Sequence, residues 1–535
     1  MNLISDQWLP VTRQDGSPCK IAPWQIAETE NPVIEINAPR VDFQGALYQF
    51  LIGLLQTTFA PEDDEAWFEC WDTVPDAQVL KKAFESVRQA FNIDISDGPA
   101  FMQDFEDFEG DSLPIEDIIG GELSVNTRDK NTDLFVKTGV TRVVSPYWAA
   151  IALFDTQTTG VLAWGKHRIG LRHNGPVTTL LTTGYESLLW QKLWLNIIDR
   201  ESGFLIRGDW EKANAEFIFP WLTKTRISPK KEKTSPADTN PLQHYWTQPR
   251  RICLQVEKVN GFCDISGESL TTGVKTYKRI KDGVFYADGW VHPLSPYVLE
   301  EKKNKFPKAL AGVDFSYGFS DWPSIVCGMH YQGKQISPAV VVQLALYERN
   351  IDDLSLWCFG YRAESAKVLG FINKKIPALR VANEKKTVLS EWTFMLIEVT
   401  EKAIEKLYVA VSEAWWGNDK AERERNKQAI AAFKKTKYLE LAFWKMAETE
   451  FYKNLSDLID SIDNHRFPSK VAQSWLQLIS STYTELFDQT VLTSDFEGKN
   501  MRRIANARNS LEKNFYRIPC VKKMQELVAK EPEVA

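Results

Sequence analysis

The sequence is poor in the residues that usually build metal centres and covalent cross-links. Its 535 residues include seven cysteines, an odd number, and no two of them form a Cys-x-x-Cys pair. This usage predicts neither a disulfide framework nor a cysteine-rich zinc site. The six histidines are too dispersed for a metal centre of the His-rich nuclease type. We therefore expect no metal and no cofactor.

Signals for export and membrane insertion are also missing. The first residues, MNLISDQW, lack the basic and apolar regions of a secretory signal, and no apolar run reaches membrane-spanning length. We expect a cytoplasmic protein with no membrane partner. Positive charge is not in excess, because the formal net charge is -7. Contacts with nucleic acid must then come from local patches, or from a site that partner subunits complete.

The usual catalytic motifs are absent as well. The chain has no Gly-x-x-x-x-Gly-Lys-Ser/Thr phosphate loop, no His-Glu-x-x-His and no Gly-x-Ser-x-Gly elbow. The acidic residues 62–65 occupy an expected helix start, where they favour the helix dipole without catalysis. These absences favour a protein that is not an enzyme.

The most informative stretch that is present covers residues 160–176. It holds four glycines, three cations and two histidines. Glycines let backbone N–H groups approach a ligand closely, and Lys166, Arg168 and Arg172 supply charge that suits a phosphate backbone. The stretch is typical of a nucleic-acid loop, although a solvated connection is the alternative. Residues 177–198 have apolar spacing that predicts a buried helix after it.

Periodicity predicts a mixed first part of the chain. We expect a hairpin near the start, amphipathic helices at 42–59 and 76–91, an antiparallel meander at 251–298 and a buried strand at 340–346. The meander has expected turns at 260–261, 282–283 and 288–289. Two further segments are less regular. Residues 134–139 carry apolar side chains at the end of a polar segment, and these side chains either enter the core or dock on a partner. Residues 223–233 are rich in basic side chains and are expected to form a surface loop.

The amino-acid composition changes near Lys385, and glycine and proline are rare after it. Helical patterns follow one another at 389–416, 419–459, 469–491 and 500–516, with a linker expected at 373–384. Four long amphipathic helices with short connections predict a four-helix bundle. The expected fold class is α+β, with a large mixed α/β domain at 1–376 followed by an all-α bundle at 385–535.

Several short segments together resemble the CasA family, the large subunit of the type I-E CRISPR surveillance complex Cascade. The similarity starts with MNLISDQWLPV and covers nearly the whole chain in order. Its other segments are FMQ at 101–103, AIALF at 150–154, GLR at 170–172 with PVTT at 176–179, WVHPLSP at 290–296 and GYR at 360–362.

The resemblance implies a non-catalytic subunit that reads the protospacer-adjacent motif of target double-stranded DNA, mainly from the minor groove. Such a subunit promotes duplex opening and R-loop formation, so that the guide RNA pairs with the target, and it recruits the helicase-nuclease. The implied partners are the guide RNA, the target DNA, the helicase-nuclease, and the backbone, small and 5′-handle-binding subunits. Two other hypotheses remain: an uncharacterised α+β nuclease, and a scaffold whose helical bundle binds proteins.

The resemblance also implies where DNA binds. The family's minor-groove lysine corresponds to Lys278, with Lys275 and Lys281 as alternatives because the hairpin here is longer than the family pattern. A flexible cation on a hairpin can reach base-edge acceptors in a narrow groove. The alternative is an exposed strand lysine with no partner.

Three other family elements map onto this chain. Where the family has Asn-Gln-Ala as a wedge, this chain has Glu364-Ser365-Ala366, so Arg362 and Lys367 are candidate substitutes. The glycine loop matches Ala163-Trp164-Gly165, followed by Lys166, and Trp164 either packs in the core or stacks on a base. The loop that contacts the guide-RNA 5′ handle and neighbouring subunits matches Phe135-Val136-Lys137.

Some members of the family have a cysteine cluster before the lysine hairpin. Only Cys253 and Cys263 stand there in this chain, so no structural zinc is expected.

Overall fold

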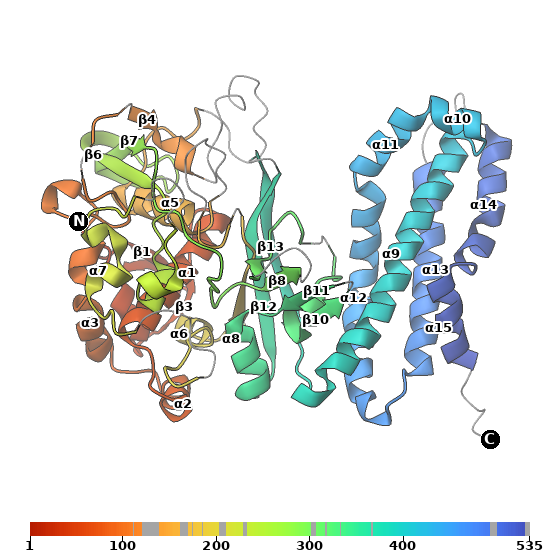
Figure 1. The fold of residues 1–535 in the computed structure, drawn as a ribbon, viewed down its shortest axis with the longest axis horizontal. Helices are drawn as coiled ribbons and strands as arrows, with labels where there is room; N and C mark the ends of the chain where they lie inside the picture. Colours follow the sequence, from red (N-terminus) through yellow and green to blue (C-terminus); the bar gives the residue numbers. More distant parts are fainter. Residues whose placement is uncertain are drawn as a thin grey trace. The chain divides into compact units, whose positions relative to one another are not determined.

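A computed structural model of the chain describes residues 1–535 except 107, 111, 120–138, 161–169, 174, 185, 203–209, 228–232, 301–305, 316–317, 332, 365–366, 493–499 and 530–535 (Figure 1). The chain divides into two compact units. The first comprises Met1–Phe315 and His330–Arg380, and the second comprises Ser316–Met329 and Val381–Ala535. None of the described helices is long and apolar enough to cross a membrane.

The first unit is built around helix α1 (Val41–Thr58), which confirms the helix predicted at 42–59. Phe50 on this helix is fully buried and makes edge-to-face contacts with five aromatic rings at centroid distances of 5.9–6.1 Å. Such pairs stabilise a core beyond their buried area alone. Those five rings belong to Trp8, Phe91, Phe101, Phe154 and Trp246.

The described strands of the first unit form four small sheets. The opening hairpin is confirmed as β1 (Leu9–Arg13) and β2 (Pro18–Ile21), with β3 (Val33–Ile36) on the other side of β1. A second sheet has the order β4-β7-β6, with β4 at Ser112–Pro114, β6 at Arg251–Phe262 and β7 at Ser269–Ile280. The third has the order β13-β12-β5, with β5 at Thr178–Thr182, β12 at Leu354–Glu364 and β13 at Lys367–Ala378. The fourth contains β8 (Tyr297–Glu300), β9 (Lys308–Ala309), β10 (Met329–Tyr331) and β11 (Lys334–Ser337).

Short helices complete the unit. The pattern at 76–91 forms α3 (Ala77–Glu85) and then a separate 3-10 turn (Arg88–Phe91). The acidic residues at 62–65 do start a helix, because the Asp63 side chain accepts a hydrogen bond from Ala66 N as the N-cap of α2. The other helices are α2 (Asp64–Asp72), α5 (Pro146–Thr158), α6 (Leu189–Trp194), α7 (Ala215–Ile218) and α8 (Val340–Gln343).

Several local predictions are wrong. Residues 177–198 are not one helix, because they form strand β5 and the short helix α6. The strand predicted at 340–346 is instead α8, followed by a π-helical turn at Leu344–Glu348. Most of the expected linker at 373–384 is strand β13 and a 3-10 turn at Asn383–Lys385. The turn expected at 260–261 lies inside β6, and the hairpin reverses at residues 263–268.

The second unit is a bundle of helices, shown in blue in Figure 1. The α+β fold class predicted from the sequence is confirmed. The pattern at 469–491 is helix α13 (Ser469–Val491), and the pattern at 419–459 is three helices rather than one. The bundle contains α9 (Lys386–Trp416), α10 (Lys420–Arg425), α11 (Lys427–Lys435), α12 (Tyr438–Asp460), α13, α14 (Met501–Phe515) and α15 (Pro519–Ala529).

A segment from the middle of the chain supplies part of the bundle core. Phe319 is buried and stacks on Phe451 of α12 with ring centroids 3.9 Å apart. It also meets Trp444 of α12 and Trp475 of α13 edge to face, at 4.7 and 5.9 Å. The Ser316–Met329 segment therefore belongs to the second unit by its packing, although the sequence places it before β10.

Candidate nucleic-acid interface

The glycine-rich stretch at 160–176 begins where helix α5 ends. The N–H of Thr159 donates to the carbonyl oxygen of Asp155 at 2.8 Å, which closes the last turn of the helix. A Cβ atom at Gly160 would lie 2.5 Å from the carbonyl oxygen of Thr156, so a larger residue does not fit. The first glycine of the stretch is therefore required by the end of the helix and is not evidence for a ligand.

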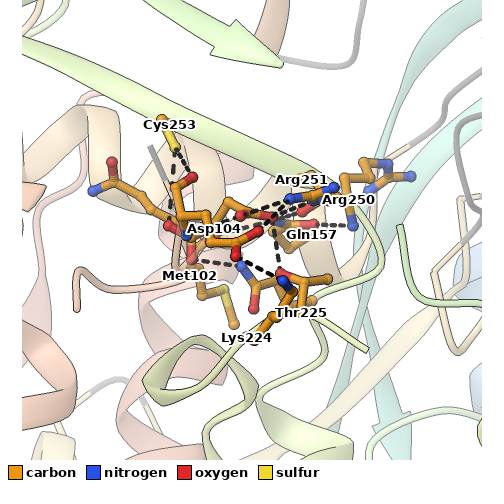
Figure 2. Close-up of polar contacts among 11 residues, drawn as sticks. Met102, Asp104, Gln157, Lys224, Thr225, Arg250, Arg251 and Cys253 are labelled. Atoms are coloured by element: carbon orange, nitrogen blue, oxygen red, sulfur yellow. Dashed lines mark hydrogen bonds and ion pairs between the residues drawn. The ribbon is translucent and has the colours of Figure 1, made fainter. Parts of the chain in front are cut away.

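A buried arginine, Arg250, holds the same end of α5, and Figure 2 shows it beside Gln157 of that helix. The guanidinium of Arg250 donates to the carbonyl oxygens of Thr156 and Gly160, the latter at 3.1 Å. The side chain of Gln157 donates to the carbonyl oxygens of Arg250 at 2.9 Å and Met102 at 3.1 Å, and it accepts from Arg250 N at 3.1 Å. These bonds tie the start of the stretch to the start of β6. No motif in the sequence marks this arginine as part of the region.

The next residue along the chain, Arg251, forms a buried ion pair with Asp104. Its Nε lies 2.5 Å from Asp104 Oδ2, and its Nη2 lies 3.1 Å from Asp104 Oδ1. The hydroxyl of Thr225 donates to the same carboxylate at 2.8 Å. Hydrogen bonding to Asp104 raises the pKa of Arg251. The pair links β6 to the basic run at 223–233, of which residues 228–232 lie outside the described part of the chain (Figure 2).

The far end of the glycine-rich stretch is anchored by Arg172. This side chain was predicted to supply charge to a phosphate backbone, and that prediction is wrong, because Arg172 is only 2% exposed. Its guanidinium donates to Gln49 Oε1 at 2.7 Å, Thr178 Oγ1 at 3.1 Å and Ser295 Oγ at 3.2 Å. Burial lowers the pKa of Arg172 to about 10, so it stays charged at neutral pH. It fixes the stretch to α1 and β5.

The middle of the stretch lies outside the residues that the structure describes. This part contains the four candidates Ala163, Trp164, Gly165 and Lys166, together with Arg168. Their contact with DNA remains a prediction. Both described ends of the stretch are held by buried arginines, and the first of these, Arg250, comes from a different part of the chain.

The candidate lysine of the hairpin lies inside a sheet. Lys278 is in β7, where it pairs with Cys253 of β6 and Ser112 of β4. The connection between β6 and β7 lies at the opposite end of the strand, so Lys278 is far along the sequence from the tip of this hairpin. Its contact with DNA stays a prediction. Side chains alternate along a strand, and Lys278 therefore faces away from the fully buried Tyr277.

Lys275 occupies a more prominent place on the same strand. The register shifts there, because Gln255 pairs with Thr276 while Val256 pairs with Val274, which leaves Lys275 as the extra residue of a β-bulge. Its ammonium lies 3.0 Å from the Glu257 carboxylate, and the side chain is 53% exposed. Of the two candidate lysines in β7, Lys275 is the exposed one and has the backbone irregularity that suits a side chain that reaches a ligand. The third candidate, Lys281, is exposed directly after the end of β7.

The candidate wedge lies at the end of a long hairpin, visible in Figure 1 as strands β12 and β13. Glu364 ends β12 and pairs with Lys367, which starts β13, so the two strands connect through residues 365–366. Ser365, Ala366 and the side chains of Glu364 and Lys367 lie outside the described set, and their contact with DNA stays a prediction. The placement suits a wedge, because the connection of a hairpin is at the end of its sheet.

Arg362 was a candidate substitute for the wedge, and the structure shows that it points inward. It is 8% exposed, and its Nη2 donates to the carbonyl oxygen of Phe315. A buried guanidinium that binds the backbone cannot also intercalate in a duplex without leaving its place. This candidate is therefore withdrawn.

The strand that follows the glycine-rich stretch and the wedge hairpin belong to one sheet. Strand β5 follows the second end of the stretch and pairs with β12, with Thr178 opposite Phe359. The same β12 carries the chain to the wedge segment. Two elements that the resemblance assigns to DNA contact are thus joined through backbone hydrogen bonds.

The candidate guide-RNA loop is not among the described residues. Phe135, Val136 and Lys137 lie outside the described residues. The chain after them returns to the sheet β4-β7-β6, called the lysine sheet because its strand β7 carries Lys275 and Lys278. There Val144 forms a two-way backbone bridge with Val274 of β7. The segment that carries this candidate loop is therefore attached to the strand that carries Lys275 and Lys278.

The two cysteines near the lysine hairpin make contacts within the protein. The Sγ of Cys263 accepts from Ser145 N at 3.4 Å, and the Sγ of Cys253 lies 3.9 Å from the carbonyl oxygen of Asp104. Within the described ranges, no three His, Cys, Asp or Glu side chains are placed to hold a metal ion. The described part of this region thus offers cations and the end of a hairpin, but no metal-binding group.

Comparisons with known proteins identify one family. A family model described as CRISPR-associated protein Cse1 matches residues 2–486. No curated protein sequence matches the chain significantly. Among solved structures, CasA from Thermus thermophilus superposes with a TM-score of 0.66 at 17% identity, covering 98% of this chain and 99% of that one.

Two other solved structures are similar to the chain over almost its full length. Cse1 from Acidimicrobium ferrooxidans has a TM-score of 0.66 at 16% identity, with 99% of each chain covered. A chain of a CRISPR RNA-guided surveillance complex has a TM-score of 0.59 at 11% identity, covering 96% of this chain and 99% of that one. These likenesses show a shared fold. Because the family model matches most of the chain, the protein belongs to the CRISPR-associated protein Cse1 family, for which CasA is another name.

Proposed function

We propose that this protein is the large subunit of a type I-E CRISPR RNA-guided surveillance complex. In this role it reads the protospacer-adjacent motif of target double-stranded DNA, promotes duplex opening and R-loop formation, and recruits the helicase-nuclease. It is not itself an enzyme, and base pairing with the guide RNA reads the rest of the target. Its partners are the guide RNA, the target DNA and the backbone, small and 5′-handle-binding subunits. Family membership and the full-length likeness to a surveillance-complex chain support this role.

The observation that carries the proposal is the sheet in which β5, the strand after the glycine-rich stretch, pairs with the wedge hairpin. Strand β5 leaves one end of the stretch, and β12, its neighbour, leads to the connection at 365–366. A loop against the DNA backbone and a wedge at the base pairs must keep a fixed spacing to open a duplex at a defined place. One hydrogen-bonded sheet provides that spacing.

The lysine sheet supplies the second part of the proposed interface. Lys275 and Lys278 offer cations for the groove, and lysines on a sheet surface can reach base-edge acceptors or phosphates. The net charge of the protein is -7, so overall electrostatic attraction does not bring it to negatively charged DNA. We therefore place recognition in a few projecting side chains, with partner subunits completing the contact.

The test is reconstitution of the complete complex with its guide RNA and a library of duplexes that are randomised beside the target. Retention of duplexes that share a two- or three-base motif is expected, and loss of motif selection is expected when this subunit is left out. Equal binding of all flanking sequences would overturn the proposal. Cleavage of DNA by the isolated chain would instead favour a nuclease, and assembly without any effect on DNA would favour a scaffold.

A further inference from the structure

Three buried polar side chains meet beneath the candidate interface. Asp155 is on α5, Asp42 is at the start of α1, and Tyr361 is on β12. Their exposed fractions are 5%, 1% and 1%. The Tyr361 hydroxyl lies 3.0 Å from Asp42 Oδ2 and also forms a hydrogen bond with Asp155 Oδ2. One hydroxyl thus bridges two carboxyl groups in the core.

The number of protons in this cluster is set by its geometry. A tyrosine hydroxyl has one proton to donate, and an ionised carboxylate can only accept. If both carboxyl groups were ionised, one of them would face the Tyr361 oxygen with no proton between the two atoms. Two buried oxygen atoms that face each other without a proton between them lower the stability of the fold. One of the two carboxyl groups must therefore carry a proton.

The surroundings decide which carboxyl group is protonated. Arg40 binds Asp42 with two bonds, Nε to Oδ1 at 3.0 Å and Nη2 to Oδ2 at 2.7 Å, so Asp42 is held in its charged form. Asp155 has no such guanidinium partner among the described residues, and its Oδ1 accepts from the hydroxyl of Thr159. The proton therefore belongs on Asp155 Oδ2, which donates to Tyr361, while Tyr361 donates to Asp42.

The charges around Asp155 agree with this assignment. Burial, together with the charge of Asp42, raises the pKa of Asp155 to about 7, and these two effects outweigh those that lower it, among them the hydrogen bond from Thr159 and the charge of Arg40. Arg172, at the far end of the glycine-rich stretch, also interacts electrostatically with Asp155. Tyr361 itself does not ionise in the neutral range, because burial and the two carboxyl groups raise its pKa. The group that changes charge near neutral pH is Asp155.

The cluster lies where the interface elements meet. Asp155 accepts the backbone bond of Thr159, the residue before Gly160, and so belongs to the turn that starts the glycine-rich stretch. Tyr361 follows Gly360, which packs against the backbone of Pro176 at the other end of the stretch. Further along the same strand, β12 ends at Glu364, where the wedge segment begins.

We propose that the hydrogen bond from the neutral Asp155 carboxyl group to Tyr361 positions the glycine-rich stretch relative to the wedge hairpin. Asp155 and Tyr361 act as positioning residues and touch no DNA themselves. When Asp155 loses its proton, the single proton of the Tyr361 hydroxyl can bond only one of the two carboxylates, so one of the two hydrogen bonds that hold α1, α5 and β12 together is lost. Motif-dependent DNA binding therefore weakens as the pH rises through neutrality. The inference rests on the proposed function.

The test measures the dissociation constant of the assembled complex for a duplex carrying the selected motif, across a pH range of about 6 to 8.5 that brackets the Asp155 titration. For the wild-type protein we expect binding to weaken by about tenfold, the effect of losing one buried hydrogen bond. Asp155→Asn keeps a donor for Tyr361 and cannot ionise, so its binding should change much less over this range. Asp155→Ala and Tyr361→Phe should bind at the weaker level at every pH.

A matched control comes from a similar pair elsewhere in the unit. Tyr48 of α1 donates to the carboxylate of Glu35 of β3 at 2.6 Å, a bond that does not involve α5, and Tyr48→Phe should leave the pH profile of DNA binding unchanged. A wild-type pH profile in Asp155→Asn would overturn the inference even if Asp155→Ala fails to fold. Absence of motif-dependent binding at every pH in the wild-type complex would instead overturn the proposed function.

Discussion

Gly360 packs directly against the backbone of Pro176. A Cβ atom at Gly360 would overlap the carbonyl oxygen of Pro176, at a separation that no real side chain tolerates. Pro176 ends the glycine-rich stretch, and Gly360 belongs to the strand that leads to the wedge segment. The absence of a single side chain therefore allows the two elements to meet.

This contact predicts that Gly360→Ala destabilises the protein. The backbone of Pro176 cannot move aside as a flexible side chain would, so we expect a loss of about 1–3 kcal/mol in the free energy of unfolding. Urea denaturation of the full chain measures it. The control is Gly370→Ala on the neighbouring strand, where an added Cβ meets nothing within 4 Å. Equal stability of the two variants would show that the contact is not tight.

The buried ion pair between Asp104 and Arg251 predicts a large loss of stability when one partner is removed. In Asp104→Ala the guanidinium of Arg251 remains buried. Among the described residues its remaining acidic partner is Glu106, whose carboxylate lies 3.6 Å from Arg251 Nη2. We expect a loss of about 3 kcal/mol in the free energy of unfolding.

The matched control for this pair is the exposed ion pair of Asp352 with Arg380, where the carboxylate side chain is 63% exposed. Asp352→Ala should cost less than about 1 kcal/mol, because water screens an exposed pair. Chemical denaturation of both variants gives the comparison. A loss in Asp104→Ala as small as in the control would contradict the role given to the buried pair.

The raised pKa of Asp155 predicts a pH-dependent difference in stability between the wild type and Asp155→Asn. The folded protein keeps the Asp155 proton up to about pH 7, whereas the unfolded chain loses it near pH 3.8. The contribution of this group to stability is therefore highest at low pH and falls as the pH rises between these two values. Above the folded-state pKa it is constant.

Asp155→Asn has no such dependence. Its stability relative to the wild type should increase by about 2 to 3 kcal/mol between about pH 5 and pH 8. Thermal or urea unfolding of the two proteins across this range measures the difference, and other titrating groups cancel in the comparison. A difference that does not change with pH would mean that Asp155 is ionised in the fold.

The two candidate lysines predict different outcomes in DNA binding. If Lys275 contacts phosphate, Lys275→Ala in the assembled complex should weaken binding to all duplexes and reduce the salt slope by about 1. If Lys278 contacts a base edge, Lys278→Ala should cost a few kcal/mol at most and act mainly on duplexes with the selected motif. Binding isotherms at several salt concentrations separate the two effects.

The control for the lysine variants is Lys402→Ala, which removes a cation of similar exposure from α9 in the second unit, where its partner is Glu405. It should leave both affinity and salt slope unchanged. Unaltered binding in Lys275→Ala and Lys278→Ala alike would remove the lysine sheet from the interface, while the family assignment would stand.

The sequence predicts elements well where one face is buried and poorly where burial is complete. Helices α9 and α13 each bury one face with a spacing of three and four residues, and both were found where expected. Strand β5 is almost wholly buried, so its apolar run has no alternation and was mistaken for a helix. Residues 340–346 show the opposite error, since local preference for a strand was overridden by packing.

The candidate site shows the same limit. Sequence resemblance placed the wedge at 364–366, and the structure has the end of the β12–β13 hairpin there. Sequence resemblance could not show that Arg172 and Arg362 are buried, because burial depends on contacts with residues far away in the chain. The cluster of Asp42, Asp155 and Tyr361 could not be predicted for the same reason, as its members come from three separate elements.

The packing of Phe319 makes the helical unit a discontinuous domain. Residues 316–329 contribute to it, yet they precede strands of the first unit, so the polypeptide changes unit three times. A protein truncated after Arg380 would keep Phe319 without Phe451, Trp444 or Trp475 to cover it. Neither unit can therefore be produced as a single continuous piece of the chain. To isolate one of them, the chain has to be cut or reconnected on both sides of residues 316–329.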